Sequence, residues 1–256
     1  KALEKRRGVD LISQRALQHS NNPKYADFLA GYGNQTVHNT YSAFGKKIIP
    51  IPVPAMEKYD FPNSKDFSAA RKHFLWFGGG GPILKGLDLV IEAFSLLPNL
   101  KLIVIGPAAF EKDFEKIYDC ELGLPNIIRY GRPRSDRNGV NWIGERKLED
   151  IMNECAAIVY PSASEGAAGS DIQAMQAGLI TIITPQTGID ERAPSVVIED
   201  PTIENIRRAV EEFSNLPAEK VRRMSEDTWL FAKENHAKEA FTRAYENFID
   251  NIVKLP

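Results

Sequence analysis

The stretch from Ala156 to Gly178 places the tightest limits on how this chain can fold. Residues 156–161 (AAIVYP) form a short apolar run, which predicts a buried parallel strand. A polar turn with glycines and one acid, Glu165, follows, and residues 172–177 predict a helix. Glycine lets the backbone approach a ligand closely, and a helix N-terminus offers free N–H groups. Open α/β sheets build ligand sites in this way, so we expect one here.

The segments around this stretch alternate between the two kinds of secondary structure. Apolar runs predict further strands at residues 73–77, 101–106, 126–130, 140–143, 179–183 and 195–198. Helical patterns occupy residues 87–97, 110–122, 147–154, 202–215 and 217–253. Such alternation predicts the α/β class, with a doubly wound, Rossmann-like parallel sheet.

The first part of the chain has a different character. We expect a charged helix in residues 1–20, a short strand at 27–31, a helix over 34–44 capped by Asn34, and an extended segment at 47–54. Residues 55–70 have the composition of a linker. We therefore place domains at 1–66 and 67–256. Because the chain begins with Lys1 rather than Met, we expect it to be a fragment.

Composition narrows the class of protein. The chain has 43% apolar and 26% charged residues and a net charge of −2, so it resembles a soluble globular protein without a nucleic-acid partner. No apolar run is long enough to cross a bilayer. Cys120 and Cys155 fit no metal or redox spacing, which indicates free thiols in a reduced, cytoplasmic compartment. The four histidines show no metal-ligand spacing either.

A glycine-rich loop, residues 77–86 (FGGGGPILKG), connects the strand at 73–77 to its helix. Four consecutive glycines suit a backbone nest for an anion. Lys85 lies where a cation opposes the helix dipole, so an anion such as a diphosphate would stabilise it. A solvated lysine beside a flexible turn is the alternative. The loop lacks the Gly-Lys-Ser/Thr ending of a triphosphate-binding loop, and no acid after residue 106 supports a dinucleotide site.

The turn around Glu165 resembles the donor-site signature of the retaining family-4 glycosyltransferases, which have the GT-B fold. That signature reads Pro-Ser-x-x-Glu-Gly-x-Gly, with a second Glu eight residues after the first. Here Pro161, Ser162, Glu165 and Gly166 match, and Gln173 occupies the place of the second Glu.

The glycine-rich loop resembles the family's first loop, Gly-Arg-x-x-x-x-Lys-Gly. Lys85 and Gly86 match it, and Gly80 stands in place of the Arg. Arg129, Arg132, Arg134 and Arg137 crowd one later loop. They either form a solvated surface or replace this missing cation.

The resemblance covers residues 73–253 and implies the C-terminal, donor-binding half of a GT-B enzyme. It implies that Glu165 contacts the donor sugar, that Lys85 binds the diphosphate and that Gln173 binds the ribose. We therefore expect Glu165 and Lys85 to be catalytic. The residues themselves leave another role open for Gln173, as part of a capping box with Ser170. The expected substrate-binding residues are Gly79, Gly80, Gly81, Gly144, Gly166, Ala167, Ala168, Gly169, Ser170 and Gln173.

The implied activity is transfer of a sugar from a nucleotide diphosphate sugar to a hydroxyl acceptor, with retention, in glycan or polysaccharide biosynthesis. The nucleotide sugar is a substrate, and we expect neither a metal nor another cofactor. A glycan or lipid-linked acceptor would bind mainly to an N-terminal domain outside this chain, with peripheral membrane association left open. We expect the fragment alone to be inactive. The alternatives are a degenerate, non-catalytic nucleotide-sugar-binding module and a nucleotide-sugar 2-epimerase of the same fold.

Overall fold

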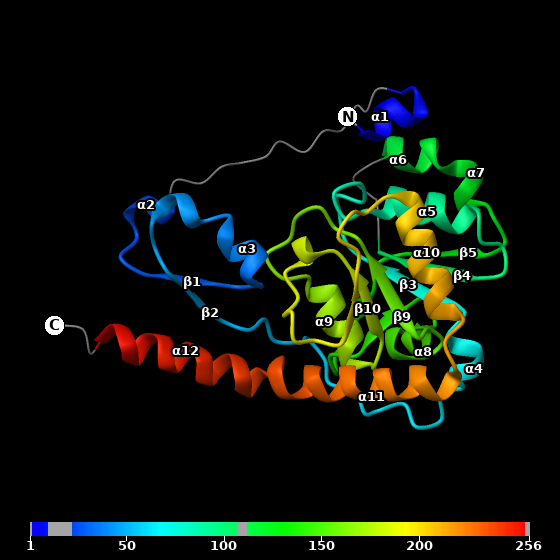
Figure 1. The fold of residues 1–256 in the computed structure, drawn as a ribbon. Coiled ribbons are helices and arrows are strands. Elements are labelled where there is room, and N and C mark those ends of the chain that lie inside the picture. The colour runs from blue at the N-terminus through cyan, green and yellow to red at the C-terminus, as the bar shows by residue number, and fades with distance from the viewer. Residues whose placement is uncertain (1, 10–21, 107–111, 254–256) are drawn as a thin grey trace.

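A six-stranded parallel sheet forms the centre of the computed structural model, which describes residues 2–9, 22–106 and 112–253 (Figure 1). The strands lie in the order β11-β10-β9-β3-β4-β5, and every neighbouring pair is parallel. Their bounds are β3 (His73–Phe77), β4 (Lys101–Ile105), β5 (Ile127–Tyr130), β9 (Ala157–Tyr160), β10 (Ile180–Ile183) and β11 (Ser195–Val197). The predicted doubly wound α/β sheet is therefore confirmed.

The central strands are buried because helices cover both faces of the sheet. Every residue of β9 and β10 is buried, as expected for apolar parallel strands. In β3, the ring of Phe74 lies 5.5 Å from that of Phe94 and 5.7 Å from that of Phe213, in edge-to-face contacts. These aromatic rings join the sheet to α5 (Leu87–Ser95) and α10 (Ile203–Ser214).

The connections after β3 and β9 run in opposite directions across the sheet. The chain goes from β3 through α5 to β4, and from β9 through α9 (Gly169–Gln176) to β10. Because parallel crossovers are right-handed, α5 and α9 cover opposite faces. Helix α5 packs with α10, and α9 packs with α11 (Ala218–Asn235). Helix α11 also contacts α4 (Phe67–Ala70), which lies within the predicted linker.

The first part of the chain forms a small separate layer (Figure 1). Strands β1 (Leu29–Gly31) and β2 (Ile48–Pro50) pair in parallel, accompanied by α2 (Asn22–Tyr25), α3 (Gln35–Asn39) and a 3₁₀ turn at Ser42–Phe44. Asn34 caps α3 as predicted, because its side chain accepts a hydrogen bond from Val37 N at 3.1 Å. Helix α12 (Lys238–Val253) runs back alongside this layer.

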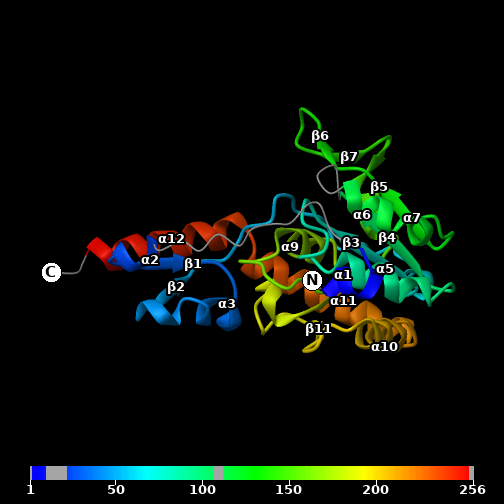
Figure 2. The same cartoon turned by 90° about the horizontal axis from the view of Figure 1, so that it is seen from above.

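A small antiparallel sheet projects from the body of the molecule (Figure 2). It consists of β6 (Arg134–Ser135), β7 (Asn141–Ile143) and β8 (Arg146–Lys147). The strand that we predicted at residues 140–143 therefore exists but lies outside the parallel sheet. Helix α8 (Leu148–Asn153) follows and leads into β9.

Several predicted helices differ in detail, and the one predicted over residues 34–44 ends at Asn39, before the separate 3₁₀ turn. Residues 217–253 form two helices, α11 and α12, rather than one. Residues 112–122 form α6 (Lys112–Ile117) and α7 (Asp119–Leu122), and the start of that prediction lies outside the described residues. Near the beginning, α1 (Ala2–Arg7) is helical, while residues 10–21 are not described.

Helix α1 docks on α5 and α7 through ion pairs. Arg6 reaches Asp88 at 2.7 Å, and Arg7 reaches Glu121 at 2.6 Å. Leu3 of the same helix is buried in the core. The boundary at residues 66 and 67 stays a prediction.

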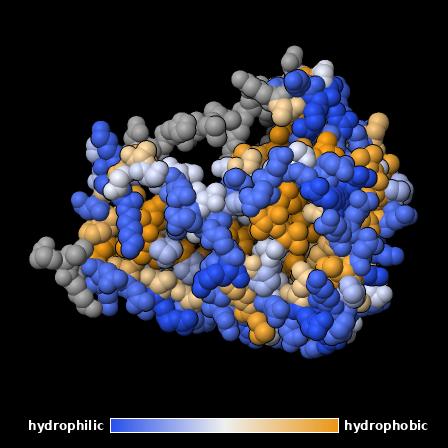
Figure 3. Space-filling view, viewed as in Figure 1, coloured by the Kyte–Doolittle hydropathy of each residue, from blue (hydrophilic) through white to orange (hydrophobic). Residues whose placement is uncertain are grey.

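Hydrophilic residues cover most of the face seen in Figure 3, and hydrophobic residues are exposed in separate patches. Among the helices of the described residues, none combines the length and the apolar character needed to cross a membrane.

Candidate functional site

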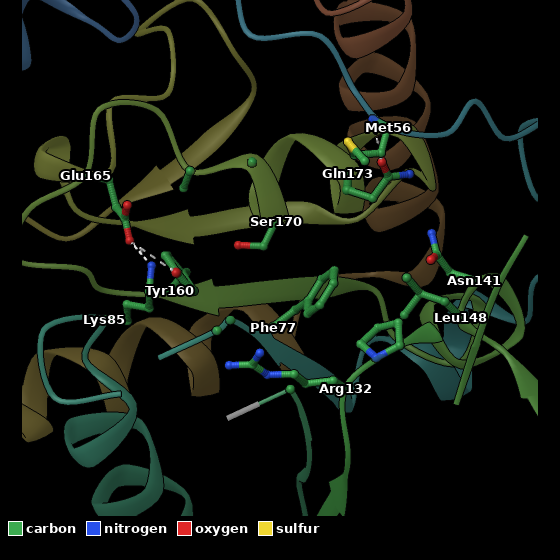
Figure 4. A pocket seen from close by; sticks show the side chains of 16 residues that line it. Met56, Phe77, Lys85, Arg132, Asn141, Leu148, Tyr160, Glu165, Ser170 and Gln173 are labelled. Atoms are coloured by element: carbon green, nitrogen blue, oxygen red, sulfur yellow. Dashed lines mark hydrogen bonds and ion pairs between the residues drawn. The ribbon is translucent and has the colours of Figure 1, made fainter. Parts of the chain in front are cut away.

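The largest concentration of predicted site residues lies where the strand order reverses, between β3 and β9. Loops that leave the carboxyl ends of these two strands diverge there and open a crevice, the usual ligand site of an open α/β sheet. A pocket of about 510 Å³ occupies this position (Figure 4). We call it the switch-point pocket. It is lined by Met56, Phe77, Gly78, Gly79, Lys85, Gly106, Arg132, Pro133, Asn141, Leu148, Tyr160, Glu165, Ala168, Gly169, Ser170 and Gln173.

Lys85, Tyr160 and Glu165 form one end of the pocket, which we call the lysine end (Figure 4). The ammonium of Lys85 makes an ion pair and hydrogen bond with Glu165 Oε1. Tyr160 donates a hydrogen bond to the same oxygen at 3.3 Å, and Lys85 Nζ lies 5.5 Å from the centre of the Tyr160 ring. The two side chains that we predicted to be catalytic therefore meet and neutralise each other.

The loop after β3 is shaped by a close approach to β9. Gly86 precedes α5 with φ of 71°, and a Cβ atom there would lie 2.5 Å from the carbonyl oxygen of Pro161. Only glycine fits this contact and this left-handed backbone. Trp76 Nε1 also donates to the carbonyl oxygen of Lys85 at 3.3 Å. Both contacts fix the backbone from which the Lys85 side chain reaches the pocket.

The loop after β9 is held by the 3₁₀ turn Pro185–Thr187. Glu165 N donates to Gln186 O at 2.9 Å, and Ala168 N donates to Thr187 O at 3.0 Å. The loop then enters α9, so Gly169 and Ser170 line the pocket from the first turn of that helix. The first N–H groups of a helix have no acceptor within it and favour an anion.

Asp171 lies just behind this wall. Its side chain is fully buried, and neither carboxylate oxygen has a hydrogen-bond partner among the described residues. Burial raises the pKa of Asp171 well above its usual range, and the nearby charge of Glu165 raises it further while Lys85 lowers it. Two acids in different environments thus lie near each other: Glu165 in the pocket, paired with Lys85, and Asp171 buried behind the wall without a hydrogen-bond partner among the described residues.

Met56, Asn141, Leu148 and Gln173 form the other end, which we call the linker end (Figure 4). Gln173 Oε1 accepts hydrogen bonds from the backbone N–H groups of Met56 and Glu57, at 2.9 and 3.0 Å. Its Nε2 donates to Glu57 O at 3.1 Å. The amide of Gln173 is therefore already bonded to the linker.

The predicted capping box is wrong. Helix α9 begins at Gly169 rather than at residue 172, and its N-cap, Ala168, makes no side-chain hydrogen bond. Ser170 therefore lies inside the first turn, and Gln173 lies three residues further along the helix. The side chain of Gln173 turns to the linker instead of back to the helix N-terminus.

Seven of the predicted residues line the switch-point pocket, and five do not. Those in the lining are Gly79, Lys85, Glu165, Ala168, Gly169, Ser170 and Gln173. Those outside it are Gly80, Gly81, Gly144, Gly166 and Ala167. Gly144 forms the turn between β7 and β8, and Ala167 lines a second cavity behind the loop. The roles of all twelve in ligand binding stay predictions.

Sequence reasoning missed several lining residues. Tyr160 is the last residue of a buried strand, so its hydroxyl lies at the carboxyl edge of the sheet. A polar group at that edge is a signal of a ligand site. Met56 carries no local signal, because its place in the lining depends on how the linker crosses α9. Of the four clustered arginines, Arg132 lines the pocket. Arg129 forms an ion pair instead, with its Nη1 3.9 Å from Glu115 Oε1. In the described parts of the chain, no three His, Cys, Asp or Glu side chains are grouped to hold a metal ion.

Comparisons with known proteins agree with this architecture. The family model described as Glycosyl transferases group 1 matches residues 71–215, more than half of the chain. No curated protein sequence matches the chain.

Solved structures share the fold at low identity. A TarM mutant from S. aureus, in complex with fondaparinux, alpha-GlcNAc-glycerol and UDP, has a TM-score of 0.68 and 15% identity, over 88% of this chain and 44% of that one. Anabaena HepE in complex with UDP-glucose has a TM-score of 0.66 and 16% identity, over 88% and 64%. WaaG, a glycosyltransferase involved in lipopolysaccharide biosynthesis, has a TM-score of 0.59 and 16% identity, over 86% and 61%. The chain therefore spans only 44% to 64% of the length of these neighbours.

Proposed function

This chain belongs to the Glycosyl transferases group 1 family, and on that premise we propose that it is the donor-binding part of an enzyme that uses a uridine diphosphate sugar. The full protein would transfer the sugar to a hydroxyl acceptor, with retention, in glycan or polysaccharide biosynthesis. TarM and HepE were solved with UDP and UDP-glucose, which supports uridine as the base. WaaG's role in lipopolysaccharide biosynthesis supports glycan assembly.

One observation carries this proposal. Lys85 and Glu165, from loops after the two strands that flank the reversal of strand order, meet beside the N-terminus of α9. A diphosphate would accept hydrogen bonds from Lys85 and from the first N–H groups of α9, which would stabilise it as a leaving group. Once released from Lys85, the carboxylate of Glu165 would be free to orient the hydroxyl groups of the sugar.

In this mechanism the protein supplies charge and orientation rather than a nucleophile. The Lys85–Glu165 pair would open as an anionic donor binds, because the diphosphate offers Lys85 a second partner. The acceptor would bind mainly to an N-terminal domain, so the chain alone would bind the donor and turn over little.

A thermal-shift titration with UDP, GDP, ADP and their sugars tests the proposal. A ligand at a hundred times its dissociation constant should raise the free energy of unfolding by about 2.7 kcal/mol. We expect UDP and one UDP-sugar to do so, and Lys85→Ala to reduce the effect to about 0.4–1.4 kcal/mol at the same ligand concentration. No response from this chain or from a full-length protein would contradict donor binding and favour a degenerate module.

A further inference from the structure

A continuous set of hydrogen bonds joins α9 to the projecting β6–β7 hairpin through the linker. Both polar atoms of the Gln173 side chain form hydrogen bonds with the linker backbone. The side chain accepts from Met56 N and Glu57 N at 2.9 and 3.0 Å and donates to Glu57 O at 3.1 Å. These residues are 116 and 117 positions apart in the chain, so the contact ties two distant segments.

The side chain of Glu57 continues the connection. Its Oε1 accepts from Asn141 N at 3.1 Å and from Asn141 Nδ2 at 2.7 Å, and its Oε2 accepts from the Tyr59 hydroxyl. Asn141 in β7 in turn accepts a hydrogen bond from the Ser135 hydroxyl in β6, at 2.6 Å. These hydrogen bonds connect α9 to the hairpin and hold the hairpin in place. Asn141 of the hairpin lines the switch-point pocket.

An amide suits position 173 in a way that a carboxylate does not. A glutamate would still accept from the two linker N–H groups, but it has no hydrogen to donate to Glu57 O. It would instead place a carboxylate oxygen against that carbonyl oxygen. Gln173 is only 4% exposed, so water has little access to relieve the conflict.

We propose that Gln173 and Glu57 are positioning residues that hold Met56 and Asn141 as the wall against which the nucleoside of the donor binds. Gln173 acts through the linker and does not contact the ribose itself. This inference rests on the proposed function, since it assigns the linker end of the pocket to the nucleoside and the lysine end to the diphosphate. Residue 173 thus differs in role from the second acid of the motif that this stretch resembles.

Isothermal titration of the 256-residue chain with UDP tests the proposal. We expect Gln173→Glu and Glu57→Ala each to weaken UDP binding about tenfold, the effect of one or two lost hydrogen bonds. Because both residues act through one connection, the double variant should bind UDP about as well as the weaker single variant. Additive losses, or a loss with Gln173→Glu alone, would overturn the proposal in favour of direct contact with the ligand.

Gln176→Glu is the matched control. Gln176 lies on the same helix, is 1% exposed and donates from Nε2 to Ala232 O at 2.9 Å, away from the pocket. The substitution removes the same kind of buried donor, so it should lower the Tm by a similar amount and leave UDP affinity unchanged. Equal weakening of UDP binding by both variants would reduce Gln173 to a general stabilising role.

Hydrogen–deuterium exchange without ligand separates this proposal from the proposed function. Gln173→Glu should raise exchange both in the linker, residues 55–59, and in the hairpin, residues 134–143. Glu57→Ala should raise exchange in the hairpin. The control Gln176→Glu should change exchange in neither segment. Glu57→Ala leaves α9 untouched and keeps the test available if Gln173→Glu does not fold. Unchanged exchange in the hairpin would refute the connection. If the unmodified chain binds no nucleotide, the proposed function fails while the exchange result still decides whether these residues position the hairpin.

Discussion

The two ends of the switch-point pocket are built from opposite kinds of interaction. At the lysine end, Lys85 and Glu165 attract each other as full charges, and their side chains are 15% and 20% exposed. At the linker end, the amide of Gln173 bonds to the neutral backbone of Met56 and Glu57. An anionic ligand can replace one partner of an ion pair, whereas displacing the amide of Gln173 would break three hydrogen bonds to the linker backbone. The lysine end is therefore suited to rearrange on binding and the linker end to stay in place.

The strengths of the interactions agree with this division. The largely buried ion pair of Lys85 and Glu165 can open without leaving the lysine unpaired, because an anionic ligand can take the place of the carboxylate. The hydrogen bonds of Gln173 contribute about 1 kcal/mol each, and breaking them leaves buried groups without partners. Opening the lysine end therefore costs less than opening the linker end. The following predictions test this contrast.

Lys85→Ala should have the largest effect. It removes a charge-assisted hydrogen bond to the diphosphate, worth about 1.5–3 kcal/mol, so UDP affinity should fall roughly ten- to a hundredfold. Uridine lacks the diphosphate and should bind the variant as well as it binds the unmodified chain. Calorimetric titration with both ligands measures the difference, and an equal loss for uridine would place Lys85 outside the diphosphate site.

Glu165→Gln should act in the opposite direction on UDP. The substitution removes the competing anion, so Lys85 becomes available at a lower cost, and UDP affinity should rise about fivefold, the equivalent of about 1 kcal/mol. Transfer by the full-length protein should fall, since the neutral amide orients the sugar less strongly. A fall in affinity for UDP would show that Glu165 does not restrain Lys85 in the free protein.

Asp171→Asn should change how stability depends on pH. The pKa of Asp171 in the folded chain is raised, so the folded state holds this proton more tightly than the unfolded state does. Its contribution to stability is fully present below the ordinary pKa of 3.8 and is lost as the pH rises toward and through the raised pKa.

The Tm of the unmodified chain should therefore fall more between pH 5 and pH 8 than that of Asp171→Asn. Each unit of raised pKa corresponds to about 1.4 kcal/mol, and a domain of this size loses roughly 2–4 °C for each kcal/mol. Differential scanning calorimetry at both values measures the two slopes. Parallel slopes would mean that Asp171 ionises in the folded chain as it does in the unfolded one.

Tyr160→Phe should have the smallest effect. It removes the 3.3 Å hydrogen bond to Glu165 but keeps the ring beside Lys85. The loss of one neutral donor to a carboxylate that retains its lysine should change UDP affinity less than about threefold. A change as large as that of Lys85→Ala would mean that the hydroxyl, rather than the ring, organises the lysine end.

The parallel sheet and the place of Lys85 and Glu165 at its carboxyl edge could be predicted before the structure was known. Apolar runs such as residues 156–161 specify buried strands, and the turn residues after them lie at the carboxyl edge of the sheet. Lys85 and Glu165 follow strands that prove to be neighbours, and their contact agrees with the family resemblance that assigned both to one site.

The contacts of the linker end could not be predicted, because they join segments that are far apart in the chain. The partners of Gln173 are backbone groups of Met56 and Glu57, and backbone groups are the same for every residue type, so no sequence pattern marks them. The local pattern favoured a capping box with Ser170, and the distant contact prevailed because α9 begins earlier and directs Gln173 to the linker. A hydrogen bond across 116 positions depends on how the chain crosses itself, which local periodicity does not contain.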